Sequence, residues 1–75
     1  MSKLYCIERD HQGVRKFVQA GAGRYSWTHY ISERTGFRSE AEAKEYARTR
    51  SIQGASVTPV LSHGCRPATD WQIAI

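Results

Sequence analysis

The sequence predicts one small α+β domain, residues 1–75, in which an antiparallel sheet of about four to five strands carries one α-helix on one face. Three observations predict this class. Short runs of β-forming residues are separated by polar or glycine-containing turns, one strong helix-start signal lies at Ser39, and a single segment has helical spacing of apolar residues. A domain of this size buries only about 60 to 65% of the surface of its unfolded chain, so a homodimer or a tightly held complex is one expectation.

Three strands are expected before the helix. Residues 4–7 are rich in β-forming residues, and a polar stretch closed by Gly13 turns the chain into a second strand over residues 14–18. Glycines at 21 and 23 end that strand. A third strand is expected over residues 24–31, and alternation directs one set of its side chains to the same side. That set is Tyr25, Trp27, His29 and Ile31.

The helix begins with a capping box. Ser39 can accept the backbone N–H of Glu42, while the Glu42 side chain can return to the N–H of Ser39. Ala43, Tyr46 and Ala47 share one face at helical spacing and are expected to pack on the sheet. We expect the chain to leave the helix before Gly54.

Two further strands are expected after the helix. Residues 57–61 look extended, but Pro59 cannot donate to a ladder, so this segment is either an edge strand or irregular. Residues 62–70 have loop composition. Residues 71–75 alternate cleanly, and a terminal strand of this kind needs a neighbour in its own chain or in a second copy.

The charge pattern favours an acidic partner. The net charge is +4, and eight of the eleven cationic residues are arginine. Residues 1–38 carry seven cations and three acids, whereas residues 39–75 carry four of each. Arginine binds carboxylates and phosphates through a planar fork of donors and also stacks on rings. The excess therefore indicates a positive surface ahead of the helix, although the same excess can serve solubility alone.

Arginines and aromatic residues gather between residues 24 and 38. Rings beside guanidinium groups are typical both of protein interface hot spots and of nucleic-acid sites. The partner-binding residues that we predict are Arg24, Tyr25, Tyr30, Arg34 and Arg38. Trp27 and Ile31 can instead be core residues on the inner side of the sheet, with Tyr25 beside them.

A basic nucleic-acid-binding protein is the alternative function. It would use the same surface for DNA or RNA, with additional contacts from Arg9, Arg15 and Lys16. A third class, a regulatory module that dimerises through its edge strands, also fits the composition.

The sequence gives little support to a metal site, a cofactor or an enzyme. Cys6, His11, His63 and Cys65 are zinc-type residues, but their spacing matches no common structural zinc site. His63 and Cys65 lack the setting of an activated nucleophile, although Asp70 could serve as an orienting acid. The glycines at 21 and 23 open no helix, so they form no phosphate loop. We therefore expect a protein without catalytic residues, metal or cofactor.

The cellular location is expected to be the cytoplasm of the host cell. No apolar leader precedes the first strand, and no apolar stretch approaches the roughly 20 residues of a membrane span. In that compartment both cysteines should be reduced, and whether Cys6 and Cys65 pair is left open.

The segment from Trp27 to Ala47 resembles a pattern of very small proteins encoded by phages and mobile elements. It consists of a tryptophan on a strand followed by Gly-Phe-Arg-Ser-Glu-Ala-Glu-Ala-Lys-Glu-Tyr-Ala. These proteins include anti-CRISPR proteins, which lack catalytic residues and cover a working surface of a CRISPR surveillance complex. The resemblance implies a steric inhibitor whose partner is a CRISPR effector subunit. The positive charge of this chain departs from the acidic DNA mimics of that class, so the resemblance implies occupation of a subunit surface rather than imitation of DNA.

Overall fold

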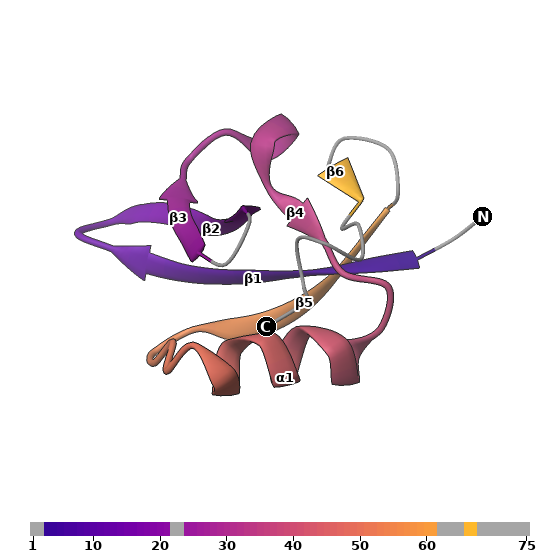
Figure 1. Ribbon diagram of the computed structural model, residues 1–75. Coiled ribbons are helices and arrows are strands. Elements are labelled where there is room, and N and C mark those ends of the chain that lie inside the picture. Colours follow the sequence, from indigo (N-terminus) through magenta and orange to yellow (C-terminus); the bar gives the residue numbers. More distant parts are fainter. Residues whose placement is uncertain (1–2, 22–23, 62–65, 68–75) are drawn as a thin grey trace.

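The computed structural model describes residues 3–21, 24–61 and 66–67. Its main element is a four-stranded antiparallel sheet with the strand order β3-β2-β1-β5. The strands are β1 (Lys3–His11), β2 (Val14–Gly21), β3 (Arg24–Thr28) and β5 (Ser56–Leu61). One helix, α1 (Glu40–Thr49), packs on one face of this sheet, which confirms the expected α+β class (Figure 1).

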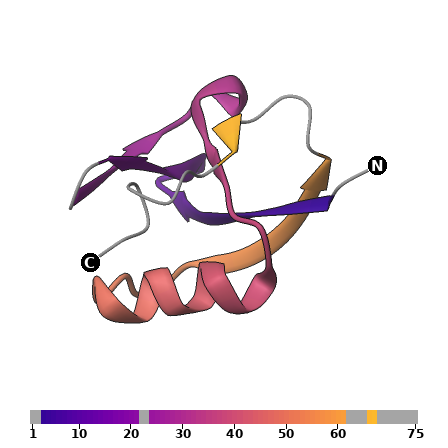
Figure 2. The ribbon, with the colours of Figure 1, turned by 45° about the vertical axis from the view of Figure 1, so that its right-hand side comes forward.

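Three short elements lie on the other side of the sheet. They are the 3-10 turn η1 (Ile31–Glu33) and the two-residue strands β4 (Thr35–Gly36) and β6 (Arg66–Pro67), which pair in parallel. Figures 1 and 2 both show these elements and α1 on opposite sides of β1. Neither η1 nor the β4–β6 pair was predicted from the sequence, because such short elements have no pattern that composition can show.

Side chains alternate along the strands, so the sheet has two faces, which we call the helix face and the η1 face. The helix face carries Ile7, Val18 and Trp27, since Val18 lies directly opposite Trp27. Ala43 and Tyr46 of α1 are buried against this face, as the helical spacing predicted. Small alanine side chains allow the helix backbone to come close to the sheet.

The η1 face is also buried over part of its area. Its buried side chains come from β1, β2 and the end of β3. They are Leu4, Cys6, Phe17 and Thr28. Burial on both faces explains how a chain of this length assembles a core: α1 covers one side of the sheet, and the guanidinium of Arg34, just after η1, lies over the Phe17 ring on the other.

The segment from Thr35 to Phe37 joins the two sides. Strands β1 and β2 pair from Glu8↔Phe17 to the turn. Nearer the N-terminus, Tyr5 exchanges backbone hydrogen bonds with Phe37, with N···O distances of 2.9 and 2.7 Å. The Thr35 hydroxyl accepts the Ala20 N–H at 2.8 Å. This segment therefore ties β1 to β2, and it carries the fully buried Phe37 into the core beside α1.

Strand β5 is an edge of the described sheet, which confirms the reading of Pro59. Pro59 lies opposite Tyr5, whose N–H and C=O are both bonded to Phe37 on the far edge of β1. Opposite residues in an antiparallel pair either exchange both hydrogen bonds or neither. The Pro59 nitrogen therefore points away from β1, where its missing hydrogen costs no ladder bond.

The first hairpin is longer than expected. Residues 8–11 were predicted to form a turn, but they continue β1, and only Gln12 and Gly13 connect the strands. Both connecting residues have positive φ, 52° and 81°, which is the geometry of a two-residue type I′ hairpin turn. The prediction of a turn over these residues was wrong, because polar side chains such as Asp10 and Arg15 form a cross-strand pair here.

The third strand is shorter than expected. It ends at Thr28, whose hydroxyl accepts the Tyr30 N–H at 3.1 Å and bends the chain. The alternative in which Ile31 is a core residue was therefore wrong, since Ile31 is 56% exposed. Tyr25 and Trp27 do lie on the helix face, where they pack half-buried against the core.

Both ends of the helix are capped. The Ser39 hydroxyl accepts the Glu42 N–H at 3.1 Å, as predicted, while the Glu42 carboxylate accepts the Arg38 N–H at 3.1 Å. At the other end, Ser51 has φ 56° and the Ile52 N–H reaches the Ala47 carbonyl at 2.9 Å. This is a Schellman arrangement in which a serine occupies the left-handed position usually held by glycine.

The expected strand over residues 71–75 lies outside the described residues, as does most of the loop predicted over residues 62–70.

Candidate functional site

The strand register divides the predicted contact residues between the two faces of the sheet. Arg9 lies directly opposite Lys16, and Asp10 directly opposite Arg15. Because neighbouring residues alternate, Arg9 and Lys16 share the helix face, whereas Arg15 lies on the η1 face. The three residues that were grouped as nucleic-acid contacts therefore do not form one surface.

On the η1 face, Arg15 is held by acidic neighbours. Its guanidinium lies 3.4 Å from the Glu8 carboxylate and 3.3 Å from that of Asp10. Glu8 also accepts the Thr58 hydroxyl. The charge of Arg15 is therefore balanced within the hairpin, which leaves it less suited to an external anion.

On the helix face, Arg9 stacks on a ring. Its guanidinium carbon lies 4.2 Å from the centroid of Trp27, a geometry that favours a cation–π interaction. The Nε atom of Arg9 is buried and has no hydrogen-bond partner within the described part of the chain. Lys16, which lies opposite Arg9, forms no ion pair with any described residue.

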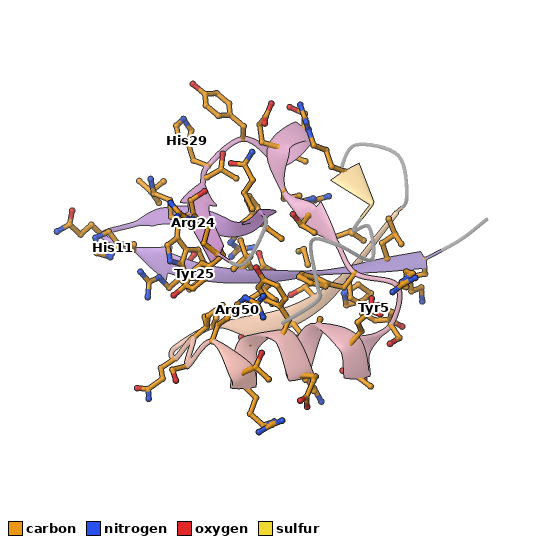
Figure 3. The ribbon with its side chains drawn as sticks, in the orientation of Figure 1. Tyr5, His11, Arg24, Tyr25, His29 and Arg50 are labelled. Carbon is orange, nitrogen blue, oxygen red and sulfur yellow. The ribbon has the colours of Figure 1, made fainter. Side chains whose placement is uncertain are left out.

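The rings of β3 extend this surface toward the end of the helix. Tyr25 meets Trp27 edge-on, with centroids 6.1 Å apart. The Tyr46 hydroxyl donates to the Arg24 carbonyl at 3.3 Å, and the Arg50 guanidinium lies 3.8 Å from the Tyr46 ring centroid. Burial raises the pKa of Tyr46 above its usual 10.0, and nearby Arg50 opposes this shift. Figure 3 labels Arg24, Tyr25 and Arg50, which come from β3 and from the end of α1.

All six acidic side chains in the described ranges form ion pairs. Their partners are five of the cations. These cations are Arg15, Arg38, Lys44, Arg48 and Arg66. The Arg38 guanidinium lies 2.8 Å from the Glu42 carboxylate, so this predicted contact residue is engaged with the first turn of its own helix.

A second group of exposed side chains lies at the corner between β3 and β4. We call His29, Tyr30 and Ile31 the corner. The rings of His29 and Tyr30 stack with centroids 4.1 Å apart, and Tyr30 and Ile31 are 60% and 56% exposed. Backbone bonds from Glu33 to Tyr30 and from Arg34 to Ile31 fix the turn. Figure 3 shows His29 on this projecting loop, away from α1.

The remaining predicted contact residues lie near the corner or on the neighbouring strand. Arg34 is less exposed than expected, because its guanidinium stacks on Phe17 at 5.2 Å and its Nε is buried. Arg24 is exposed and forms no ion pair with the described residues. A surface hollow of about 300 Å³ lies beside Arg24 and Tyr25.

Two features of this site escaped the sequence analysis. The Arg9–Trp27 contact joins β1 to β3 across β2, so it depends on the registers of two hairpins. The predicted alternation grouped His29 and Ile31 with Trp27 on one side of the strand, but β3 ends at Thr28 and the alternation ends with it. The exposure of Tyr30 could be predicted from the sequence, because alternation places Tyr30 on the other side of the segment from Trp27, His29 and Ile31.

The thiol and imidazole groups provide no assembled centre in the part that the structure describes. Cys6 is fully buried, while His63 and Cys65 lie outside the described residues. No group of three His, Cys, Asp or Glu side chains in the described ranges is arranged to hold a metal ion. Among the described helices, none combines the length and apolar character needed to cross a bilayer.

Comparison of the chain with protein-family models, with curated proteins and with solved structures gives no match.

Proposed function

We propose that this protein is a non-enzymatic binding protein that docks on an acidic surface of a host protein complex through the corner. The observation that carries the proposal is the exposure of consecutive large side chains, Tyr30 and Ile31, on a turn fixed by hydrogen bonds. Val14, beside the turn of the first hairpin, is the remaining exposed large hydrophobic residue among those described.

The chemistry of the corner suits a protein interface. Tyrosine supplies a large contact area with few rotatable bonds, and such residues dominate interface hot spots. Arg24 and Arg34 are cations without acid partners in the described ranges, and they can meet carboxylates at the rim of an interface. Because the turn is already ordered, binding costs less conformational entropy than ordering a loose loop would.

In this proposal, two of the predicted contact residues contribute less to partner binding. Arg38 is paired with Glu42, and Tyr25 packs against the core on the helix face. His29 and Ile31 take their place at the interface. The surface is therefore narrower than the predicted one and more apolar.

The resemblance to anti-CRISPR proteins supplies the class of partner. A compact protein that covers a working surface needs a rigid scaffold and a contact patch, but no catalytic group. We propose that the partner is a subunit of a CRISPR effector complex in the host cytoplasm and that inhibition is steric.

The test compares the affinities of variants for a partner that is captured from the host. The tagged protein is used to capture partners from nuclease-treated host lysate, and the affinity of the recovered partner is then measured. Replacing Tyr30 and Ile31 by serine together should weaken this affinity at least about tenfold, because each truncation removes an interface anchor. The unfolding temperature should stay nearly unchanged, since both side chains are exposed.

Val14→Ser is the matched control, because it removes an exposed apolar side chain that belongs to the first hairpin and not to the corner. It should leave the affinity unchanged. Full affinity of the Tyr30 and Ile31 double variant would overturn the proposal.

A further inference from the structure

The two faces of the first hairpin carry different arrangements of charge. On the η1 face, Asp10 and Arg15 are directly opposite and oppositely charged. On the helix face, the next pair along is Arg9 and Lys16, which are directly opposite and have the same charge. Like charges in this position destabilise a sheet. A bound anion between the two cations would remove this repulsion.

Arg9 is prepared for such a ligand. The Trp27 ring 4.2 Å away holds its guanidinium in one place, so little side-chain freedom is lost on binding. The Arg9 side chain is half-exposed, so the side of the guanidinium that faces away from the ring can support a base. A guanidinium presents several donors in one plane, which matches the oxygens of a phosphate.

Lys16 completes the site from the neighbouring strand. Its side chain is half-exposed, and it forms no ion pair with a described residue. The Cβ atoms of directly opposite residues lie about 5 Å apart, so each of the two cations can contact one of two neighbouring phosphates on a strand. Tyr25 and Trp27 follow along the same face toward the end of α1, where they remain partly exposed.

We propose that the helix face binds the phosphate backbone of single-stranded nucleic acid through Arg9 and Lys16. A single strand is favoured because its bases are free to stack on the guanidinium plane and the neighbouring rings, whereas duplex bases are already stacked on each other. This activity goes beyond the proposed function, since it uses a face of the sheet that does not include the corner.

The direct test is a titration with oligothymidylate of about twelve nucleotides, which is within the usual range of single-strand sites. Trp71→Phe leaves Trp27 as the sole tryptophan, so that fluorescence reports from the site itself. Binding should change the Trp27 emission. The logarithm of the affinity should fall with the logarithm of salt concentration with a slope of about −1.4, as expected for two phosphates on a single strand.

Charge-matched variants separate this site from the effect of net charge. Lys16→Gln should lower the affinity several-fold and reduce the salt slope by about 0.7, because one phosphate contact is lost. Lys44→Gln changes the net charge equally, but Lys44 is paired with Glu40 on the helix, so affinity and slope should stay unchanged. Arg9→Gln and Arg15→Gln form the second matched pair, and only the former should weaken binding.

Three results would overturn the proposal: absence of binding at low salt, equal losses in the matched variants, or equal affinity for a duplex of the same length. The Lys16 variant leaves the Arg9–Trp27 stack intact, so its result does not depend on that contact for folding. The Tyr30 and Ile31 double variant should bind oligothymidylate normally, which keeps failure of this site distinct from failure of the proposed function.

Discussion

The two faces of the first hairpin share one backbone and one turn, yet they carry opposite charge arrangements. The η1 face places Arg15 between Glu8 and Asp10, so that its charges compensate each other. The helix face places Arg9 opposite Lys16 and leaves both without an acid partner in the described ranges. The first arrangement serves the stability of the hairpin, and the second does not.

This difference indicates which residues are candidates for function, since the described part of the protein contains no assembled catalytic centre. A sequence usually satisfies local rules of pairing, and the positions that break them are often functional. Arg9 and Lys16 break the cross-strand charge rule one step away from a pair that obeys it. Trp27 then compensates in part, because its ring supports one of the two cations.

The largest effect is expected from removing that ring. Trp27→Ala should lower the free energy of unfolding by about 2–3 kcal/mol, less than for a fully buried tryptophan because Trp27 is half-buried. Urea denaturation measures the change. Ser26→Ala is the control, since Ser26 is the exposed neighbour on the η1 face and should shift the value by less than about 0.5 kcal/mol. Similar small shifts in both variants would show that Trp27 does not anchor the helix face.

Reversing the charge on the compensated face should have the next largest effect. Arg15→Glu removes two ion pairs and places three acids together, so we expect a loss of about 1.5 kcal/mol in low salt. High salt should shrink the loss, because Arg15 and Asp10 are exposed to solvent. Thermal or urea unfolding at two salt concentrations tests this. An unchanged stability would mean that Arg15 is not balanced by Glu8 and Asp10.

The pH dependence of Tyr46 sharpens the description of the helix face. Burial raises the pKa of Tyr46 in the folded protein above 10.0, so its contribution to stability is complete below pH 10.0 and is lost as the pH rises through the folded pKa. Tyr46→Phe should cost about 1 kcal/mol at neutral pH through the lost bond to Arg24. The difference between the two proteins should narrow above pH 10.0. A constant difference across that range would contradict burial of the hydroxyl.

The sequence predicted the parts of the fold that depend on local chemistry. Ser39 begins the helix as expected, because its hydroxyl caps the first turn, and Ala43 and Tyr46 face the sheet because they share one side of the helix. Pro59 lies on an edge of the described sheet because it lacks a donor. Each of these properties belongs to one residue or to a spacing of a few residues.

Other features depend on contacts between distant segments. Phe37 bonds to Tyr5, which lies 32 positions earlier in the chain, and no local pattern predicts this pairing. The exposure of Ile31 follows from the point at which β3 ends, where the Thr28 hydroxyl accepts the Tyr30 N–H. The binding surfaces were mixed in the prediction for the same reason. Composition identified the cations, but only the strand register separates Arg15 from Lys16.

The variant with the smallest expected change in stability tests the contrast between the two faces most directly. Lys16→Glu replaces the like-charged pair with an attractive one, so unfolding in low salt should require about 0.5 kcal/mol more free energy. Oligothymidylate binding by the same variant should be abolished. A gain in stability together with a loss of binding would confirm that the cationic pair is kept for a phosphate ligand. A variant that is less stable than the natural protein, or that binds oligothymidylate at full strength, would contradict it.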